Sequence, residues 1–449
     1  MITSMVNLIF FLCIPAFYIS ASLPLVVQLT TEAKLLPLYI SPIQNEQSGF
    51  SEAYLKKLES VLNFDFQNNG MTNVVDPSLK DSSINQTMNF DYQGDLSFWS
   101  SLDVEYVLKT KINNKSFSAR IWIVNGSVIK AIDGLLLTGD FTHDRQVMHQ
   151  LSDSIFKALF GKEGIASTKI LYTLKHRDLT GKKLTSTIYE ADYDGGNAHP
   201  VTEGCDFAIT PFYIPPRSGY KSNSFLFVSY KTGQPKIYFG SLQDLQAHRF
   251  SLLKGNQFFP VMSKQRDKIA FISDVTGNPD LFLQEFHPEK GVLGKPRQIY
   301  ATHKATQSSP TFSPDGTQVA FVSNQDGSPR IYVLKIPDPN VGIKEIKAKL
   351  ISKTNRENTA PNWSPDGSKI AYSSQVKGVR QICVYDFATN SERQLTEGNQ
   401  NKENPTWAPN SLHLIFNTSD KEDTELYLMN IKQKTPIKIT NGFFPCWEN

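Results

Sequence analysis

The side chains best suited to catalysis or metal binding are scattered along this chain. His143 and His149 are the nearest pair among eight histidines, and their spacing of six residues does not place them on one face of a helix. The segment Gly49–Ala53 (GFSEA) comes nearest to the Gly-x-Ser-x-Gly motif of hydrolases, but it begins a predicted helix. We therefore predict no catalytic residue, no metal site and no cofactor.

One acidic segment is similar to the start of a calcium-binding loop. Asp192–Gly195 (DYDG) has acidic residues at alternate positions, but the remaining ligand positions of such a loop are missing. Asp and Gly are also the residues that tight turns favour. We therefore predict a hairpin turn between two strands here.

Three cysteines follow the N-terminal segment, and an odd, sparse set does not form a disulfide framework. Cys383 occupies the position of an aromatic core residue in a repeat described below. Cys205 and Cys446 fall on an outer and an innermost predicted strand, about 14 Å apart at three strand spacings. We expect free thiols.

Polar pairs at four equivalent positions are the candidate binding residues. Each pair lies shortly before a proline that begins a repeat, and we predict that the pairs form loops on one face of a rigid scaffold. Together they would make a concave, partner-binding rim. These rim residues are Asn256, Gln257, Gln307, Ser308, Glu357, Asn358, Glu403 and Asn404.

The repeat itself defines the elements that position these residues. Residues 309–316 (SPTFSPDG) return as 360–367 (APNWSPDG) and, loosely, as 404–411 (NPTWAPNS). Weaker copies extend the series to six anchor prolines, separated by 49, 50, 51, 44 and 40 residues by subtraction. The anchors are Pro211, Pro260, Pro310, Pro361, Pro405 and Pro445. A period near fifty residues indicates a supersecondary unit that is stable only beside its neighbours.

Each anchor begins a similar order of short strands. An aromatic or Met segment comes first, then a turn, then two apolar strands such as 319–322 and 331–333, and finally a shorter fourth strand. Four strands in a unit that packs on both faces are typical of a β-propeller blade. An open solenoid or two sandwiches would be the alternative, but they would need a capped edge, and we find no cap sequence.

The ends of the repeat series predict a closed ring. Residues 170–173, 187–189 and 200–202 supply three strands with no anchor before them, whereas Pro445 is an anchor with no strands after it. The C-terminal strand should therefore complete the first blade. We predict a mainly β fold, a six-bladed β-propeller over residues 169–449 that is closed by the C-terminal strand and preceded by a small α/β domain.

The N-terminal third has a different pattern. Residues 1–22 contain an apolar run followed by small residues, which predicts a secretory signal peptide and no stable membrane insertion after its cleavage. Residues 23–161 should form the α/β domain, and residues 162–168 a linker. Within that domain we predict helices at 51–66 and 144–160, strands at 103–112 and 116–124 joined by a hairpin turn at Asn113-Asn114, and a second hairpin at Asn125-Gly126.

Composition narrows the classes of function. A formal net charge of +3 on 449 residues gives no reason to expect nucleic acid as a partner. Hydrophobic content of 40% and charged content of 20% are ordinary for a globular protein.

Taken together, these features resemble the TolB family of the Tol–Pal system. The resemblance rests on the Ser-Pro-Asp-Gly blades, residues 152–156 continuing through 161–164, the segment Asp192–Gly195, and the ending 444–447 (FPCW). It implies a non-enzymatic protein of the periplasm. Such a protein binds the peptidoglycan-associated lipoprotein Pal through its propeller and communicates with inner-membrane Tol proteins through its N-terminal region. It serves outer-membrane integrity and cell division.

The chain departs from the family pattern in four places. Its N-terminal segment lacks basic residues before the apolar run, the copy at Pro260 reads Met-Ser-Lys at residues 262–264, and residues 216–224 resemble an insertion. Residues 22–29 do not match the family's N-terminal partner-binding stretch, so the resemblance supports Pal as a partner more than TolA. The alternative function is a polysaccharide-acting, lyase-like propeller enzyme, which would need histidines and carboxylates converging on the central tunnel.

Overall fold

The computed structural model describes residues 34–75, 89–92, 97–126, 128–177, 184–203, 207–217, 220–419, 424–433 and 435–448. Residues 33–449 belong to one compact unit. The predicted signal peptide and Cys205 lie outside the described residues.

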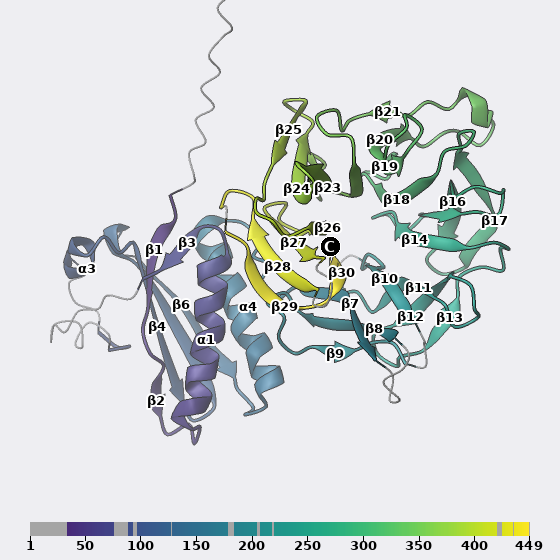
Figure 1. The fold of residues 1–449 in the computed structure, drawn as a ribbon. Helices are drawn as coiled ribbons and strands as arrows, with labels where there is room; N and C mark the ends of the chain where they lie inside the picture. The colour runs from purple at the N-terminus through teal and green to yellow at the C-terminus, as the bar shows by residue number, and fades with distance from the viewer. Residues whose placement is uncertain are drawn as a thin grey trace, which may run out of the picture. The chain divides into compact units, whose positions relative to one another are not determined.

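An α/β domain comes first in the chain (Figure 1). Its six-stranded sheet has the order β3-β1-β4-β5-β6, and β2 also pairs with β4. Strand β1 is parallel to β3 and β4, whereas β4, β5 and β6 form antiparallel hairpins. The elements are β1 (Leu36–Ile40), β2 (Gln44–Glu46), α1 (Glu52–Asn68), β3 (Thr72–Val74), α3 (Ser97–Ser101), β4 (Tyr106–Asn113), β5 (Ser116–Ile123), η1 (Val124–Gly126), β6 (Val128–Leu136) and α4 (Phe141–Phe160).

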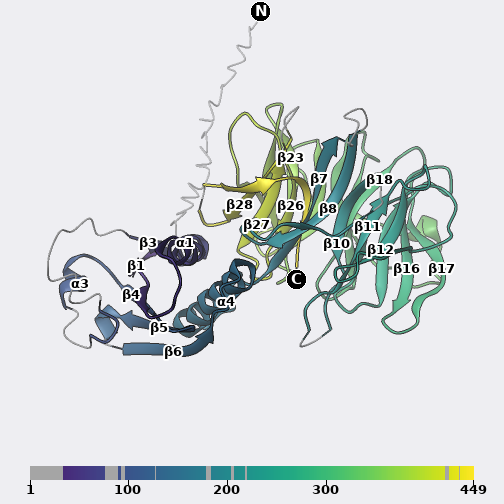
Figure 2. The ribbon, with the colours of Figure 1, turned by 90° about the horizontal axis from the view of Figure 1, so that it is seen from below.

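Helices α1 and α4 lie together on one face of this sheet (Figure 2). The predicted spacing on α1 is confirmed, because Leu55, Leu58 and Leu62 are buried in one cluster with the inner faces of β4 and β5. Ser51 caps α1 by accepting a hydrogen bond from the Tyr54 amide.

The second predicted helix begins three residues earlier than expected. Asp140 is its N-cap and accepts from the Thr142 amide, so α4 starts at Phe141 rather than at Asp144. Gly161 ends the helix as predicted, in a left-handed conformation at φ 66°. Both predicted hairpins of the sheet, at Asn113-Asn114 and Asn125-Gly126, are also confirmed.

The rest of the chain is a six-bladed propeller, as the repeats predict. Each blade is a four-stranded antiparallel sheet. Blade one contains β30 (Phe443–Trp447), β7 (Lys169–Arg177), β8 (Leu184–Asp192) and β9 (His199–Pro200). Blade two contains β10 (Ala208–Tyr213), β11 (Ser224–Ser229), β12 (Lys236–Ser241) and β13 (Ala247–Arg249), and blade three contains β14 (Gln257–Met262), β15 (Lys268–Ser273), β16 (Asp280–His287) and β17 (Gly291–Tyr300).

Blades four to six follow the same plan. Blade four contains β18 (Gln307–Phe312), β19 (Gln318–Ser323), β20 (Arg330–Lys335) and β21 (Lys349–Leu350), with η2 (Ile343–Glu345) before its last strand. Blade five contains β22 (Asn358–Trp363), β23 (Lys369–Val376), β24 (Val379–Asp386) and β25 (Ser391–Gln394). Blade six contains β26 (Lys402–Trp407), β27 (His413–Thr418), β28 (Glu425–Asn430) and β29 (Ile437–Asn441).

The C-terminal strand closes the ring, as predicted. Strand β30 pairs with β7 and places Trp447 opposite Ile170. The Trp447 indole is 1% exposed, and its Nε1 donates to Thr168 Oγ1 at 2.8 Å. One buried side chain thus ties the last residues of the propeller to the first.

The second strands are buried on both faces, as their continuous apolar sequences predict. Cys383 takes the cross-strand position that aromatic residues occupy in other blades, and it packs opposite Tyr372. Burial raises the pKa of its thiol to about 12. Cys383 and Cys446 are both free and buried.

None of the helices in the described part of the chain is long and apolar enough to span a bilayer.

Candidate functional site

The first strands of the six blades surround a central channel of about 120 Å³. All six anchor prolines line it, together with neighbouring residues such as Phe212, Phe259 and Asn404. The walls are therefore mainly proline, aromatic and neutral polar groups. A lining of this kind suits contact with another polypeptide better than proton transfer or metal binding.

A backbone irregularity recurs at this channel in every blade. The residue before each anchor proline has a positive φ between 47° and 53°, although none of the six is glycine. At the same place the pairing between the first and second strands shifts register, which is a β-bulge. The six residues are Thr210, Phe259, Ser309, Ala360, Asn404 and Phe444. The bulge turns the anchor segment toward the channel.

Six of the eight predicted rim residues lie in the first half of these strands, which corrects their assignment to loops, whereas Asn256 and Glu357 directly precede their strands and lie in loops as predicted. Gln257, Gln307 and Asn358 are the first residues of their strands and are at most 1% exposed. Gln257 Nε2 donates to Ser251 Oγ at 3.0 Å, and Asn358 Nδ2 donates to the Asn355 carbonyl at 2.7 Å. These hydrogen bonds hold the side chains inward, because a buried amide group needs hydrogen-bond partners within the protein.

The other rim residues are half-buried. Asn256 is tied to Asp274 by its backbone amide and by its side chain, at 2.7 and 2.6 Å. Asn404 Nδ2 donates to Asn417 Oδ1 at 2.9 Å, and Ser308 is the second residue of β18. Several polar side chains of the rim are therefore already hydrogen-bonded within the protein, and fewer of them can bind a partner than the sequence suggests.

The two rim glutamates are joined by an arginine that the sequence analysis did not single out. Arg380, on β24, lies with its Nε 3.2 Å from Glu403 Oε1 and its Nη2 3.8 Å from Glu357 Oε2. The two carboxylates come from neighbouring blades, so the structure brings them together. Glu357 stays the more accessible, with 46% of its side chain exposed against 29% for Glu403.

A second group of polar residues lies where α4 meets blade one. Arg145, in the first turns of α4, donates from Nε to Asp192 Oδ2 at 2.9 Å and from Nη2 to Asp194 Oδ2. Its side chain is 11% exposed, and the two carboxylates are 4% and 7% exposed. The predicted turn at Asp192–Gly195 is present, but it also carries this buried ion pair between the α/β domain and the propeller.

His149 extends this network one helical turn further along α4. Its Nδ1 lies 2.9 Å from Asp65 Oδ2 on α1, and Asp65 Oδ1 accepts from the Tyr193 hydroxyl at 2.8 Å. Burial by itself would lower the pKa of His149. The charge and hydrogen bond of Asp65, with the nearby Asp194 carboxylate, outweigh this and raise the pKa above its usual value.

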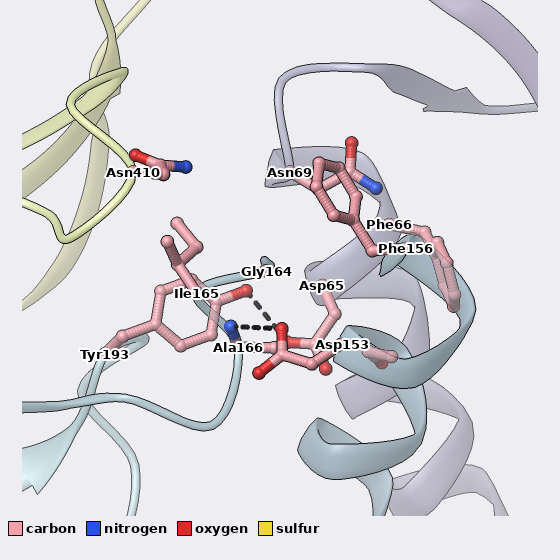
Figure 3. A pocket seen from close by; sticks show the side chains of 11 residues that line it. Asp65, Phe66, Asn69, Asp153, Phe156, Gly164, Ile165, Ala166, Tyr193 and Asn410 are labelled. Carbon is pink, nitrogen blue, oxygen red and sulfur yellow. Dashed lines mark hydrogen bonds between the residues drawn. The ribbon is translucent and has the colours of Figure 1, made fainter. Parts of the chain in front are cut away.

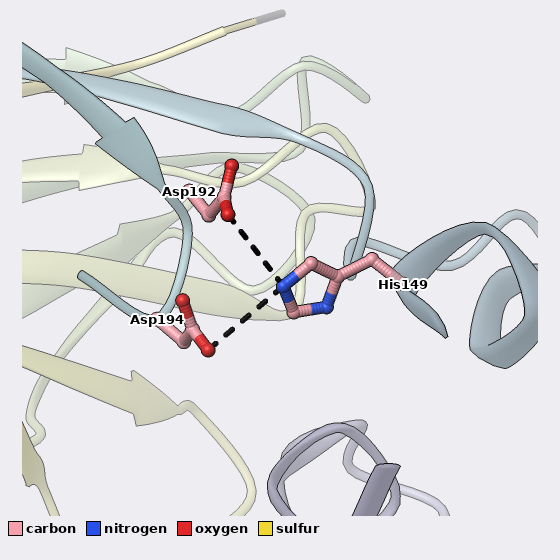
Figure 4. Close-up of side chains that lie close together, drawn as sticks. All are labelled: His149, Asp192 and Asp194. Atoms are coloured by element: carbon pink, nitrogen blue, oxygen red, sulfur yellow. Dashed lines mark ion pairs between the residues drawn. The ribbon is translucent and has the colours of Figure 1, made fainter. Parts of the chain in front are cut away.

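The same histidine could be taken for a metal ligand. Its Nε2 points between Asp192 and Asp194, 3.8 and 3.9 Å from their Oδ2 atoms (Figure 4). Those Oδ2 atoms already accept from Arg145, and a metal ion there would lie close to the guanidinium charge. The donor set therefore suits an ion-pair network with a protonated histidine better than a metal centre.

A small cavity lies beside this network, between α4 and the predicted linker. Its volume is about 10 Å³, which matches roughly one water molecule. Figure 3 shows Tyr193 directed toward Asp65 at its wall. The Asp153 carboxylate accepts from the Ala166 and Ser167 amides, both at 2.9 Å, so the segment between α4 and β7 is held by hydrogen bonds.

A third contact joins the end of α1 to blade six. His413, on β27, is 1% exposed, and its ring nitrogens lie 3.0 Å from the amide groups of Asn410 and Asn430. Burial lowers the pKa of His413 to about 4, although a backbone hydrogen bond with Asn68 acts in the opposite direction. This histidine is neutral at physiological pH.

The sequence contained one signal for the first of these contacts. Arg145 and His149 are four residues apart on a predicted helix, so they share a face. The pair His143 and His149, six residues apart, does not reveal this pattern.

Comparison with known proteins identifies the family to which this architecture belongs. A family model described as "TolB beta propeller domain" matches residues 156–449, more than half of the chain. The chain belongs to the TolB family. A curated relative named "Protein TolB homolog" from Protochlamydia amoebophila is 52% identical over 385 residues, covering 85% of this chain and 81% of the relative.

Two further TolB proteins extend the comparison. A "Protein TolB homolog" from Chlamydia abortus is 42% identical over 272 residues, covering 61% of this chain and 62% of that protein. The crystal structure of TolB from Acinetobacter baumannii aligns with a TM-score of 0.71 at 20% identity, covering 92% of this chain and 97% of that one. At that identity the structural match concerns the fold, and it spans both domains of this TolB-family chain.

Proposed function

We propose that this chain is the periplasmic component of a Tol–Pal system and that its propeller binds the peptidoglycan-associated lipoprotein Pal. The observation that supports this most strongly is the 52% identity to a TolB homologue over 85% of the chain. In this proposal the protein also contacts inner-membrane Tol proteins through its N-terminal region. It thereby links the two membranes for envelope integrity and cell division.

The residues around the central channel favour binding over catalysis. The first strands of the blades carry proline, aromatic and amide groups there, and Arg380 joins Glu357 and Glu403 at the start of two of these strands. Among the described residues, histidine and carboxylates come within metal-binding distance at α4 and blade one, away from the channel lining. The arrangement therefore lends no support to the lyase-like alternative, and we propose a non-enzymatic scaffold.

The test is binding of purified Pal to the purified mature protein by titration calorimetry. Reversing both rim carboxylates with Glu357→Lys and Glu403→Lys leaves Arg380 unpaired among like charges. We expect affinity for Pal to fall by about tenfold or more, since like charges at an interface cost several kcal/mol. The buried rim residues are left unchanged, because replacing them would disturb the blades.

The matched control is Glu289→Lys with Glu345→Lys, which makes the same charge change at exposed positions away from the channel lining. The control should bind Pal as the wild type does. If wild type binds Pal but the rim variant keeps full affinity, Pal binds elsewhere on the protein. If wild-type protein does not bind Pal at all, the proposed function itself is wrong.

A further inference from the structure

The turn of blade three carries an arginine where blades four and five have glycine and blade six has Ser411 at φ 56°. Residues 263–266 (SKQR) occupy the place of Ser313–Gly316, and Arg266 donates its amide to the Ser263 carbonyl at 2.9 Å as Gly316 does to Ser313. Gly316 and Gly367 have φ values of 68° and 75°, and Arg266 has 59°. An arginine is thus held in a backbone conformation that normally selects glycine, and such strain is often associated with function.

The insertion noted in the sequence lies beside this arginine. Residues 214–223 connect the first two strands of blade two, where residues 313–317 suffice in blade four. The described part of this loop and Arg266 together line a cavity of about 400 Å³. Its cationic side chains are Arg217, Lys221 and Arg266. Two unrelated departures from the repeat therefore meet at one cavity.

The cavity has an excess of positive charge. Burial and the neighbouring charge of Arg217 both lower the pKa of Arg266, so the two guanidinium groups repel each other. Arg266 Nε is buried and has no hydrogen-bond partner among the described residues. One carboxylate reaches the cavity wall, because Glu448 accepts from the Ser222 amide at 3.2 Å and its charge acts on Lys221, whereas Asp267 pairs with Lys268.

We propose that this cavity binds a phosphate group. Three cations around one cavity outnumber the single carboxylate of Glu448, so the cavity favours an anion such as a phosphate, and the planar guanidinium fork fits two phosphate oxygens at once. Tyr220, 75% exposed, adds a neutral donor at the cavity wall. The ligand would remove the repulsion between Arg217 and Arg266. The same chemistry is supplied by a free phosphate and by a phospholipid head group, and the site is independent of Pal binding.

The decisive variant is Arg266→Gly, which restores the residue that the turn prefers and removes the guanidinium. Pyrophosphate titration at low ionic strength should show wild-type binding that weakens at least tenfold in this variant. Its thermal midpoint should equal or exceed that of the wild type, so the loss cannot come from misfolding. A second arm compares flotation with vesicles of phosphatidylcholine alone and vesicles that also contain phosphatidylglycerol.

The matched control is Lys304→Gly. Lys304 is an exposed residue of the loop between blades three and four with a φ of 61°, so this change also removes one positive charge and relieves one left-handed backbone conformation. It should keep wild-type pyrophosphate and vesicle binding. Pyrophosphate binding that depends on Arg266 supports a free phosphate as ligand, and Arg266-dependent flotation supports a lipid head group. Equal losses in both variants, a lower midpoint for Arg266→Gly, or no binding by wild type in either arm would overturn the proposal.

Discussion

Two histidines are buried where the α/β domain meets the propeller, and their surroundings differ in charge. His149 on α4 faces carboxylates, whereas the side-chain partners of His413 on blade six are the neutral amides of Asn410 and Asn430. The pKa of His149 is therefore raised and that of His413 is lowered, to about 4. Burial acts in the same direction at both sites, so the partners decide which histidine carries a charge.

The two contacts of the α/β domain with the propeller differ in kind. The contact with blade one is an ionic network that is stable only if its charges balance. The contact with blade six is neutral and closely packed, so an added charge or an added side-chain atom there should destabilise the protein. The two contacts should therefore fail in different ways, and each of the following changes tests one of them.

The largest effect should come from Arg145→Ala. This change leaves Asp192 and Asp194 buried without their guanidinium partner, and breaking a buried pair costs about 3–5 kcal/mol. The free energy of unfolding, measured by urea denaturation, should fall by that amount.

The control for this variant lies on the same helix. Lys157 pairs with Glu163 across side chains that are 61% and 77% exposed, so Lys157→Ala should cost about 1 kcal/mol or less. Similar losses for the two variants would show that the network with blade one contributes no more than a surface ion pair.

The next effect is on the pH dependence of the free energy of unfolding, which should have opposite signs for His149 and His413. His149 has a raised pKa in the folded state, so it stabilises the protein at pH values below the usual histidine pKa of about 6.5. This contribution is lost as pH rises through the folded-state pKa. A lowered pKa contributes above about pH 6.5 and is lost as pH falls toward about 4. For His413 the loss on acidification should reach about 3 kcal/mol.

Unfolding free energies of wild type, His149→Gln and His413→Gln across this pH range test the difference. The advantage of wild type over His149→Gln should shrink with rising pH, and its advantage over His413→Gln should shrink with falling pH. The charged and titratable groups that face His149 among the described residues are Asp65, Asp192, Asp194, Arg145 and Tyr193. Slopes of the same sign for both variants would contradict the assignment of charge.

The smallest effect concerns the close packing at blade six. Gly70, after α1, has φ 79°, and a Cβ there would collide with Asn430 Nδ2 and lie 3.3 Å from the His413 ring. Gly70→Ala should cost about 1–3 kcal/mol more than Gly49→Ala because of overpacking. Gly49 has a similar φ of 74° with nothing within 4 Å, so it isolates the backbone cost. Equal thermal and denaturant midpoints for the two variants would show that blade six yields to the added methyl group.

Most of the fold could be predicted because its signals are local. An anchor proline marks each blade, Asp-Gly turns follow two of the anchors, and the unmatched Pro445 indicates ring closure without any knowledge of strand pairing. The spacing of Leu55, Leu58 and Leu62 predicted α1 because helical periodicity is a property of consecutive residues. The start of α4 was wrong by three residues because the capping role of Asp140 was not recognised.

The candidate site could be predicted only in part. Gln257 and Asn358 were taken for loop residues because polar character suggests exposure, whereas the strand register turns both side chains inward. The bulge before each anchor proline leaves no clear mark in sequence, since the six equivalent positions at a positive φ hold Thr, Phe, Ser, Ala, Asn and Phe. Arg380 was missed because it reaches Glu357 and Glu403 from another strand.

The family, the six blades and the closing strand follow from the amino-acid sequence alone, because each depends on periodicity, turn chemistry and the order of segments along the chain. Which polar groups are charged and paired follows from the three-dimensional fold. Arg145 meets Asp192 and Asp194 across 47 and 49 residues, and His149 meets Asp65 across 84. The energy of such pairs depends on distance and burial in space, and neither quantity is carried by any single segment of the chain.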